Sequence, residues 1–443
     1  MVPADDKQGK WIIDPFRMQG INGYLYGRGV SDNKGPIMAA LYGVVDLIHK
    51  QELESDITFL IEGEEESGSR GFGEAVRRNK QLIGDIDYII LANSYWLDDE
   101  VPCLTYGLRG VLHATIKVDS IHPDVHSGVD GSFMMDEPLF DLTAILAKLK
   151  GRHNRVQIPG FYDAILPLTK AEEARYDDIT ETLIRRNPEN GPADTLKASL
   201  MARWREPNLT IHRYKVSGPD GSLVSSHASA AVSLRLVPNQ EVDDVIRMLI
   251  AFLENAFAEL DTHNHLSISI DNRADAWLGD PDNEIFRTLE EAIMEVWGPI
   301  GEARRGSLTA AKQNTRQPVP QSPSLKPAPA TTITLTNGSD HTSLASLPEE
   351  VLNDDDSKLP ASESASTTPV SPIKKGRKPL YIREGGSIPS IRFLEKEFNA
   401  PAAHLPCGQA SDSAHLDNER LRVSNLLKSR EIFKKVFREL PRK

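Results

Sequence analysis

The acidic segment 62–69 holds the side chains best suited to chemistry. It reads Glu-Gly-Glu-Glu-Glu-Ser-Gly-Ser and directly follows the apolar run 57–61, which is typical of a short buried strand. Ligands of open α/β sheets gather outside the carboxyl ends of strands, so Glu65 and Glu66 are placed to hold a metal ion and to act as a base. A solvated acidic turn is the alternative interpretation.

Three further residues are candidates because of their type and surroundings. Asp32 follows the strand-like 24–28 and precedes a predicted helix, so it is placed either to bind a ligand or to cap the helix, and the two roles are compatible. His126 and His415 are flanked by small or polar residues rather than by an apolar face. A single histidine of this kind is more often an exposed or hydrogen-bonded side chain than a ligand.

Alternating strand-like and helix-like patterns must position these residues. From residue 24 to about 107, apolar spacing predicts a helix over 36–50 and strands over 57–61 and 85–92. This alternation is typical of an α/β domain with a mostly parallel sheet. The same domain resumes near the helix-like segment 283–297 and ends in a basic amphipathic helix around 419–439.

A second unit interrupts this domain between about 108 and 271. Residues 111–118 and 228–236 alternate apolar and polar side chains, which predicts antiparallel strands with one buried face. Helical spacing follows at about 136–150 and 240–258. We expect an inserted α+β domain, with its helices on one face of the sheet.

The tract 302–376 is rich in Ser, Thr and Pro and lacks aromatic residues, so it predicts a disordered insertion. The expected domain order is catalytic α/β domain 1–107, α+β dimerisation or lid domain 108–271, catalytic domain continued 272–301, insertion 302–376, and last part of the catalytic domain 377–443.

The composition excludes several classes of partner. The 443 residues include 51 Lys and Arg against 64 Asp and Glu, and a net charge of −13 repels nucleic acid phosphates. No run of about 18 apolar residues predicts a membrane span, and the first residues do not resemble a signal peptide. The two cysteines, Cys103 and Cys407, cannot form a zinc site alone, so a metal needs Asp, Glu and His ligands. We expect a cytoplasmic protein that binds neither nucleic acid nor a membrane.

Several short motifs in series match one known family. They are Gly-Arg-Gly-Val-Ser-Asp-Asn-Lys-Gly at 27–35, Glu-Gly-Glu-Glu-Glu-Ser-Gly-Ser at 62–69, Leu-Thr-Tyr-Gly-Leu-Arg-Gly at 104–110, His-Ser-Gly at 126–128, Arg-Leu-Val-Pro-Asn at 235–239, Arg-Glu-Gly-Gly-Ser-Ile-Pro at 383–389 and Ala-His at 414–415. In their order and spacing, the chain resembles the di-zinc metallopeptidases typified by the carnosine dipeptidases, the carboxypeptidase S type and the aminoacylases. The resemblance covers nearly all of the chain outside 302–376.

This resemblance implies roles for the residues of the metal centre. Asp32 would bridge two zinc ions, Glu66 would bind one of them and His415 the other. Glu65 would be the general base that takes a proton from the attacking water and passes it to the leaving amine. The structural alternatives are surface carboxylates and a loop histidine.

The resemblance also assigns residues to substrate binding and to a dimer. His126 would reach the active site of a partner subunit and stabilise the oxyanion, which implies a homodimer through the 108–271 unit. Arg235 would bind a substrate carboxylate, and Ser387 would line the pocket beside it. An ordinary solvated arginine and a turn serine are the alternatives.

Two departures from the family pattern stand out. Asn93 occupies a position where relatives have an aspartate, and an amide is a poorer zinc ligand than a carboxylate. Relatives also carry a His-x-Asp pair, a zinc ligand and the residue that orients it, just before a Val-Pro-Ala stretch. This chain begins Met-Val-Pro-Ala, so we expect an N-terminally truncated catalytic domain.

Within the family, the chain most resembles the metallopeptidase subunit of the fungal glutathione-degradation complex, which acts with an amidotransferase-like partner. The expected function is hydrolysis of the amide bond of a small peptide, either a dipeptide or the γ-glutamyl bond of glutathione within a complex. One alternative is a catalytically impaired scaffold subunit of such a complex, and another is a module that binds peptides without hydrolysis.

Overall fold

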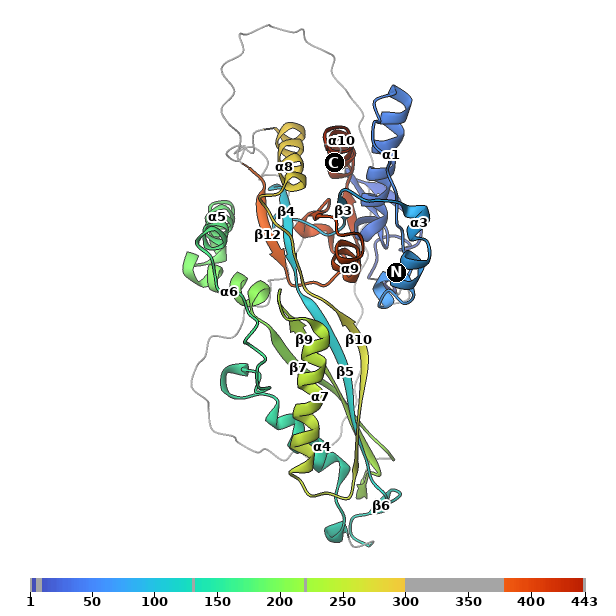
Figure 1. Cartoon of the computed structure of the whole chain (residues 1–443), viewed down its shortest axis with the longest axis vertical. Coiled ribbons are helices and arrows are strands. Elements are labelled where there is room, and N and C mark those ends of the chain that lie inside the picture. Colours follow the sequence, from blue (N-terminus) through green and yellow to red (C-terminus); the bar gives the residue numbers. More distant parts are fainter. Residues whose placement is uncertain (1, 5–9, 130–131, 219–220, 299–377, 441–443) are drawn as a thin grey trace, which may run out of the picture. The chain divides into compact units, whose positions relative to one another are not determined.

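The structure is a computed structural model that describes residues 2–4, 10–129, 132–218, 221–298 and 378–440 (Figure 1). The predicted disordered insertion, 302–376, lies outside the described residues. Within those ranges, no helix is both long enough and apolar enough to cross a membrane.

A five-stranded sheet forms the centre of the part that the sequence predicts to be the catalytic domain. Its strands follow the order β11, β4, β13 and β3, with β12 paired to β4. Their bounds are β3 Ile89–Ala92, β4 Cys103–Leu108, β11 Trp277–Leu278, β12 Leu380–Glu384 and β13 Ala402–Leu405. The β13–β3 and β12–β4 pairs are parallel, whereas β11 and β13 run antiparallel to β4. The described sheet is therefore mixed, and the prediction that it is mostly parallel is not confirmed.

Four helices bury their apolar faces in the core of this sheet. They are α1 Gly35–Lys50, α8 Glu284–Trp297, α9 Pro389–Phe398 and α10 Val423–Glu439. On α1 and α10, Leu47 and Phe433 are almost fully buried, which stabilises the fold by roughly 1.5–3 kcal/mol for each side chain. The two helices approach closely at Gly43, where a Cβ atom would lie 3.2 Å from the Arg430 carbonyl oxygen. Arg430 Nε also donates to Asp46 Oδ2 at 2.8 Å across this contact.

A small antiparallel sheet brings the two ends of the described chain together. Its strands are β1 Gln19–Ile21, β2 Tyr24–Tyr26 and β14 Arg420–Arg422, in the order β1, β2, β14. Tyr26 lies opposite Arg420, so the segment after β2 and the segment before β14 leave the sheet at the same point. These are the segments that carry Asp32 and His415.

The prediction of a buried strand over 57–61 is wrong. This run joins no sheet among the described residues, and Leu60 and Ile61 are 40% and 65% exposed. A buried strand needs neighbours on its edges, and β3 ends the described sheet without a second partner. Instead, 57–61 and β3 line a groove of about 860 Å³. The short helices α2 Phe72–Arg78 and α3 Lys80–Ile83 follow this segment.

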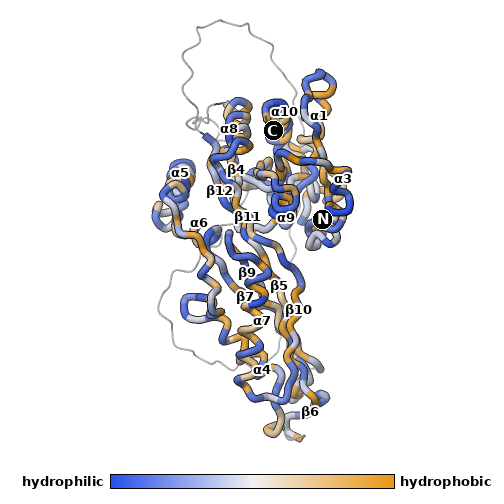
Figure 2. Tube along the Cα trace, in the orientation of Figure 1, coloured by the Kyte–Doolittle hydropathy of each residue, from blue (hydrophilic) through white to orange (hydrophobic). Residues whose placement is uncertain are grey.

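The segment 108–271, which the sequence predicts to be the lid domain and which we call the lid, contains a second sheet. This sheet is fully antiparallel, in the order β10, β5, β9, β7. Its strands are β5 Gly110–Asp119, β7 Asn208–Val216, β9 His227–Leu236 and β10 His265–Ala274. Burial alternates residue by residue along β9 and along most of β5, which confirms the predicted period of two. Figure 2 shows that hydrophobic and hydrophilic stretches are mixed along the strands of this sheet.

Two helices cover the apolar face of the lid sheet. They are α4 Pro138–Lys148 and α7 Val242–Ala258, which match the predicted helices 136–150 and 240–258 to within a few residues. Leu142 and Ile145 from α4 pack with Leu249 and Leu253 from α7 in one core with the strands. A hairpin of β6 Val125–His126 and β8 Leu223–Val224 forms a separate two-stranded sheet.

A helical pair that the sequence analysis did not predict completes the described fold. It consists of α5 Lys170–Arg186 and α6 Ala193–Arg205. Thr169 caps α5 by accepting the backbone N–H of Glu172 at 3.1 Å, and Tyr176 stacks near Trp204. Glu172 also binds Arg383 of β12 at 2.9 Å, so the pair is anchored to the catalytic sheet.

His404 on β13 generates a prediction about stability in acid. The side chain is fully buried, its Nε2 lies 2.8 Å from the Asn93 carbonyl oxygen, and burial lowers its pKa from 6.5 to about 4. Below pH 6.5 the unfolded chain binds a proton that the folded protein cannot accept. The stability that the neutral ring provides is therefore lost as the pH falls from 6.5 towards 4.

His404→Gln keeps an N–H donor for Asn93 and removes the titration. We expect its free energy of unfolding to fall less between pH 7 and pH 4 than that of the unsubstituted protein, by about 3 kcal/mol. Urea unfolding at both pH values measures this difference. His49→Gln, at an exposed position on α1, is the control and should behave like the unsubstituted protein. Equal losses in all three proteins would contradict the prediction.

Candidate metal centre

Three ligand-type side chains converge next to the small β1–β2–β14 sheet. Asp32 Oδ2 lies 2.8 Å from His415 Nε2, and Glu66 Oε1 lies 3.1 Å from the same nitrogen. The ligand atoms of the three residues all lie within 4.8 Å of one another. Asp32 follows β2, His415 precedes β14, and Glu66 lies in the short 3₁₀ turn Glu65–Ser67. The structure thus brings together three residues that the sequence analysis named as metal ligands.

The chemistry of this donor set fits zinc. Two carboxylate oxygens and one imidazole nitrogen are ligands that zinc commonly takes in proteins. Burial raises the pKa of Asp32, and burial together with the charge of Asp32 raises the pKa of Glu66. A cation at this point would favour the charged form of both carboxylates. Within the described residues this is the one such group, and three ligands are enough for one cation but few for two.

The backbone around these ligands is unusual in two places. His415 has a φ of 66°, in the left-handed region that costs a residue with a side chain free energy. The Asp32–Asn33 peptide bond is cis. Gly35, where α1 begins, has no room for a side chain, because a Cβ atom would lie 2.4 Å from the Val30 carbonyl oxygen. The turn between Asp32 and α1 therefore depends on glycine.

Asn93 is the first residue after β3 and lies against Asp32. It is buried, its side-chain amide donates a hydrogen bond to Asp32, and its carbonyl oxygen accepts one from His404. This hydrogen bond acts to lower the pKa of Asp32, although burial outweighs it. The neutral amide therefore supports the Asp32 carboxylate without adding a charged ligand.

Glu65 lies beside the three converging side chains. Burial raises its pKa to about 7, and the negative charges of Glu66, Asp32 and Glu62 act in the same direction. A carboxylate with a pKa near neutrality is suited to general base catalysis, because it can both take and return a proton. The arrangement places a candidate base next to a candidate metal site.

Arg235 and Ser387 meet at the boundary between the lid sheet and the loop after β12. Arg235 Nη1 donates to Ser387 Oγ at 3.1 Å. Arg109 lies nearby, since burial and the charge of Arg235 lower its pKa to about 10. Neither arginine forms an ion pair with a carboxylate in the described part of the chain. Two partly buried guanidinium groups of this kind form a suitable binding site for an anion.

Two residues of this region were missed by the sequence analysis. Arg109 belongs to the motif at 104–110, but the sequence analysis assigned it no role. Its Nε donates to the Gly385 carbonyl oxygen at 3.3 Å. Glu384 accepts hydrogen bonds from Ser94 Oγ at 2.7 Å and from Thr105 Oγ1 at 2.9 Å, and burial raises its pKa. No cation pairs with Glu384 among the described residues. The position of Glu384 depends on the pairing of β12 with β4, which no sequence pattern indicates.

His126 is not among the converging residues. It lies on β6 of the lid, exposed, opposite Leu223 of β8, and its Nδ1 accepts the backbone N–H of Gly128 at 3.1 Å. Its role therefore stays a prediction from the family resemblance.

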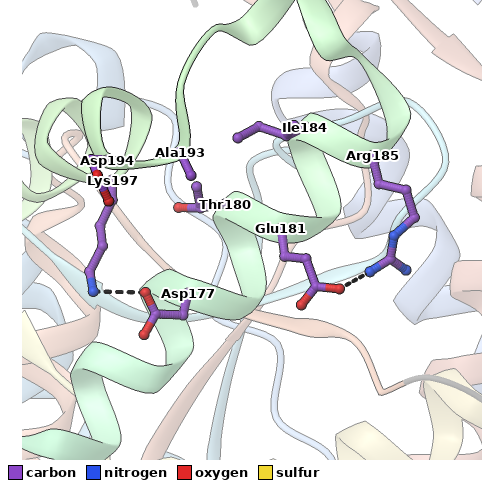
Figure 3. A pocket seen from close by; sticks show the side chains of 8 residues that line it. All are labelled: Asp177, Thr180, Glu181, Ile184, Arg185, Ala193, Asp194 and Lys197. Atoms are coloured by element: carbon purple, nitrogen blue, oxygen red, sulfur yellow. Dashed lines mark hydrogen bonds and ion pairs between the residues drawn. The ribbon is translucent and has the colours of Figure 1, made fainter.

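A second hollow, of about 440 Å³, lies between α5 and α6 (Figure 3). Both of its basic side chains are paired: Lys197 Nζ donates to Asp177 Oδ1 at 2.7 Å, and Arg185 pairs with Glu181. A third carboxylate, Asp194, also lines the hollow, so it does not resemble the anion site at Arg235.

The comparisons with known proteins agree with this geometry. Residues 1–320 match the model of Peptidase family M20/M25/M40. The chain is 36% identical over 432 residues to the protein named Probable di- and tripeptidase DUG2 of Saccharomyces cerevisiae, covering 97% of this chain and 40% of that protein. It is 32% identical to human Beta-Ala-His dipeptidase, covering 67% of this chain and 60% of that protein. Cys-Gly metallodipeptidase DUG1 of Candida albicans is 27% identical over 95% of this chain and 73% of its own length.

Solved structures show the same fold. Human carnosine dipeptidase 1 superposes with a TM-score of 0.64 at 25% identity, covering 98% of this chain and 77% of that one. An M20 family metallo-carboxypeptidase from Sulfolobus solfataricus gives a TM-score of 0.70 at 20% identity, which supports the fold alone. The chain spans less than two thirds of the length of the yeast DUG2 protein and of the human dipeptidase. With its match over residues 1–320 and its 36% identity to a relative across 97% of its length, the chain belongs to Peptidase family M20/M25/M40.

Proposed function

We propose that this protein is a zinc-dependent metallopeptidase that hydrolyses the amide bond of small peptides. The observation that carries the proposal is the convergence of Asp32, Glu66 and His415, whose ligand atoms lie within 4.8 Å of one another, with Glu65 beside them. The names of the relatives, di- and tripeptidase, Beta-Ala-His dipeptidase and Cys-Gly metallodipeptidase, support peptides of two or three residues as substrates.

In this proposal Asp32, Glu66 and His415 hold the zinc. Zinc bound there supplies a positive charge that polarises the scissile carbonyl group and lowers the pKa of the attacking water. Glu65 accepts a proton from that water as its oxygen bonds to the carbonyl carbon. The same carboxyl group then returns the proton to the amide nitrogen as the C–N bond breaks, so the leaving group departs as an amine.

Two charged sites would orient the substrate. Arg235 and Ser387, 3.1 Å apart, would bind the terminal carboxylate, with the charge of Arg109 in support. Glu384, which lacks a positively charged partner among the described residues, is suited to a substrate ammonium group. A peptide of two or three residues carries one group of each kind.

The second zinc of the family needs ligands beyond these three. The groove between 57–61 and β3 has an unpaired strand edge on β3 and opens at Asp32, Glu65 and Glu66. We propose that a further strand lies in this groove and carries the His-x-Asp pair of the family.

The assembly of the protein is likewise proposed. A homodimer through the lid would let His126 reach the active site of the partner subunit, and its exposed place on β6 leaves it accessible for this role. From the family resemblance of its motifs, we also propose a place in a glutathione-degrading complex with an amidotransferase-like subunit. The free, buried thiols of Cys103 and Cys407 are consistent with the cytoplasm.

One observation favours a second candidate function, that of a catalytically impaired scaffold. Asn93 supplies a neutral amide where relatives have a carboxylate, and the described residues provide three ionisable ligands. A scaffold would keep the fold and the partner contacts and lose the metal.

Glu65→Gln tests the general base. We expect kcat for a dipeptide to fall by about 10²- to 10⁴-fold, because the amide cannot accept the proton. The zinc content should stay unchanged, since Glu65 is not a ligand. Glu64→Gln, at the exposed neighbouring position, is the matched control and should keep its activity. Full turnover by the Glu65→Gln protein would remove the proposed base.

Arg235→Met tests recognition of the carboxylate. Loss of a charge-assisted hydrogen bond should raise KM for a dipeptide with a free carboxylate by about 10- to 100-fold. The same dipeptide with an amidated C-terminus should show little difference between the two proteins. Equal effects on both substrates would mean that Arg235 does not read the carboxylate.

Metal content separates the enzyme from the scaffold. After dialysis against zinc and then against buffer, the enzyme proposal expects about one zinc or more per chain by elemental analysis. Asp32→Ala should lose most of it. A content well below one in the unsubstituted protein would favour the scaffold.

A further inference from the structure

Glu419, four residues after His415, is a buried carboxylate with an unusual set of partners. Its side chain is 1% exposed and pairs with Arg28, whose side chain is 3% exposed. Within the described residues, the hydrogen-bond partners of this side chain all lie in the segment 28–32, nearly four hundred residues earlier in the sequence. That segment ends at Asp32.

Both oxygens of Glu419 are occupied. Oε2 accepts Arg28 Nη1 at 2.8 Å and the backbone N–H of Gly29 at 2.9 Å. Oε1 accepts the backbone N–H groups of Ser31 and Asp32, each at 3.0 Å. One carboxylate therefore satisfies three backbone donors of a single loop.

The backbone nitrogen of Asp32 and its side chain are bonded to the same Cα atom. Fixing this N–H limits the directions in which the Asp32 carboxylate can point. On the other side of the pair, Arg28 Nη2 reaches the His415 carbonyl oxygen at 3.4 Å. The Arg28–Glu419 pair thus contacts the backbone of both Asp32 and His415, whose side chains lie 2.8 Å apart.

We propose that Glu419, together with Arg28, is a positioning group of the metal centre. It holds the backbone of Asp32 and His415 so that their side chains face one cation before the cation arrives. Partners behind the ligands that fix ligand direction contribute strongly to metal affinity. The proposal rests on the proposed metal site.

An ordinary buried ion pair that only stabilises the fold is the competing explanation. Glu172 provides a matched comparison, because its side chain is 6% exposed and binds two arginines, Arg383 at 2.9 Å and Arg205 at 3.2 Å. In the described part of the chain, neither its ion pairs nor its hydrogen bonds involve Asp32, Glu66 or His415.

Glu419→Gln and Glu172→Gln separate the two explanations. In Glu419→Gln one oxygen is replaced by an NH₂ group, so either Arg28 and Gly29 or Ser31 and Asp32 lose their acceptor and face amide hydrogens instead. Both substitutions should lower the melting temperature. We expect the dissociation constant for Zn²⁺, measured by chelator competition, to rise about 10- to 100-fold in Glu419→Gln alone. The absorption spectrum of bound Co²⁺ should change in the same variant only.

Arg28→Lys and Arg205→Lys repeat the comparison with milder changes if Glu419→Gln does not fold. Lysine keeps the charge but cannot bind Glu419 and the His415 carbonyl together, so metal affinity should fall in Arg28→Lys and not in Arg205→Lys. Unchanged affinity in the Glu419 or Arg28 variant, or an equal loss in its control, overturns the positioning role. If the unsubstituted protein binds no Zn²⁺ or Co²⁺, the proposed function itself fails and the positioning role fails with it.

Discussion

The pairing of β2 with β14 is the contact on which the candidate centre depends. It places two segments from opposite ends of the sequence side by side, with Tyr26 opposite Arg420. Without it, Asp32 and His415 would have no reason to meet, since each lies in an irregular loop. The carboxylate of Glu419 continues the same contact beyond the last strand pair, where backbone donors would otherwise be buried without an acceptor. Where the strand pairing ends and the loops that carry the ligands begin, the Glu419 carboxylate takes the place of a backbone acceptor.

The electrostatics of the centre point in one direction. Burial raises the pKa values of Asp32, Glu65 and Glu66, the negative charges of neighbouring carboxylates raise them further, and the interaction with His415 acts in the opposite direction. Such an arrangement is costly in a fold that only needs stability. Around Arg235 the sign is reversed, because burial lowers the pKa values of Arg109 and Arg235, the charge of Arg235 lowers that of Arg109 further, and neither arginine pairs with a carboxylate of the described chain. An acidic centre and a basic site together would suit the zwitterionic peptide of the proposed function.

Local patterns predicted much of the fold. The apolar spacing of α1, α4, α7 and α8 and the period of β5 and β9 gave elements close to those observed, because each pattern reflects one buried face. The run 57–61 failed for the opposite reason: strand residues become buried only when neighbours exist, and this is not a local property. The α5–α6 pair was missed although Thr169 and Glu172 form a capping signal. For the site, residue types and motifs named Asp32, Glu66 and His415, whereas Glu384 and Glu419 needed the folded chain, since their partners are hundreds of residues away.

The junction between the two sheets shows how such a protein can be built. One residue separates β4 from β5 on the way into the lid, and two separate β10 from β11 on the way out. The two connections lie side by side. Val111 pairs with Ala274 in the lid sheet, and Leu108 pairs with Trp277 in the five-stranded sheet. Gly110 has no space for a methyl group there, because a Cβ atom would lie 2.7 Å from the Ala274 carbonyl oxygen. The lid is therefore a module whose entry and exit strands pair with one another where they leave the catalytic sheet. Such a junction is a natural point for evolution to add, exchange or remove a whole domain without altering the register of the sheet beneath it.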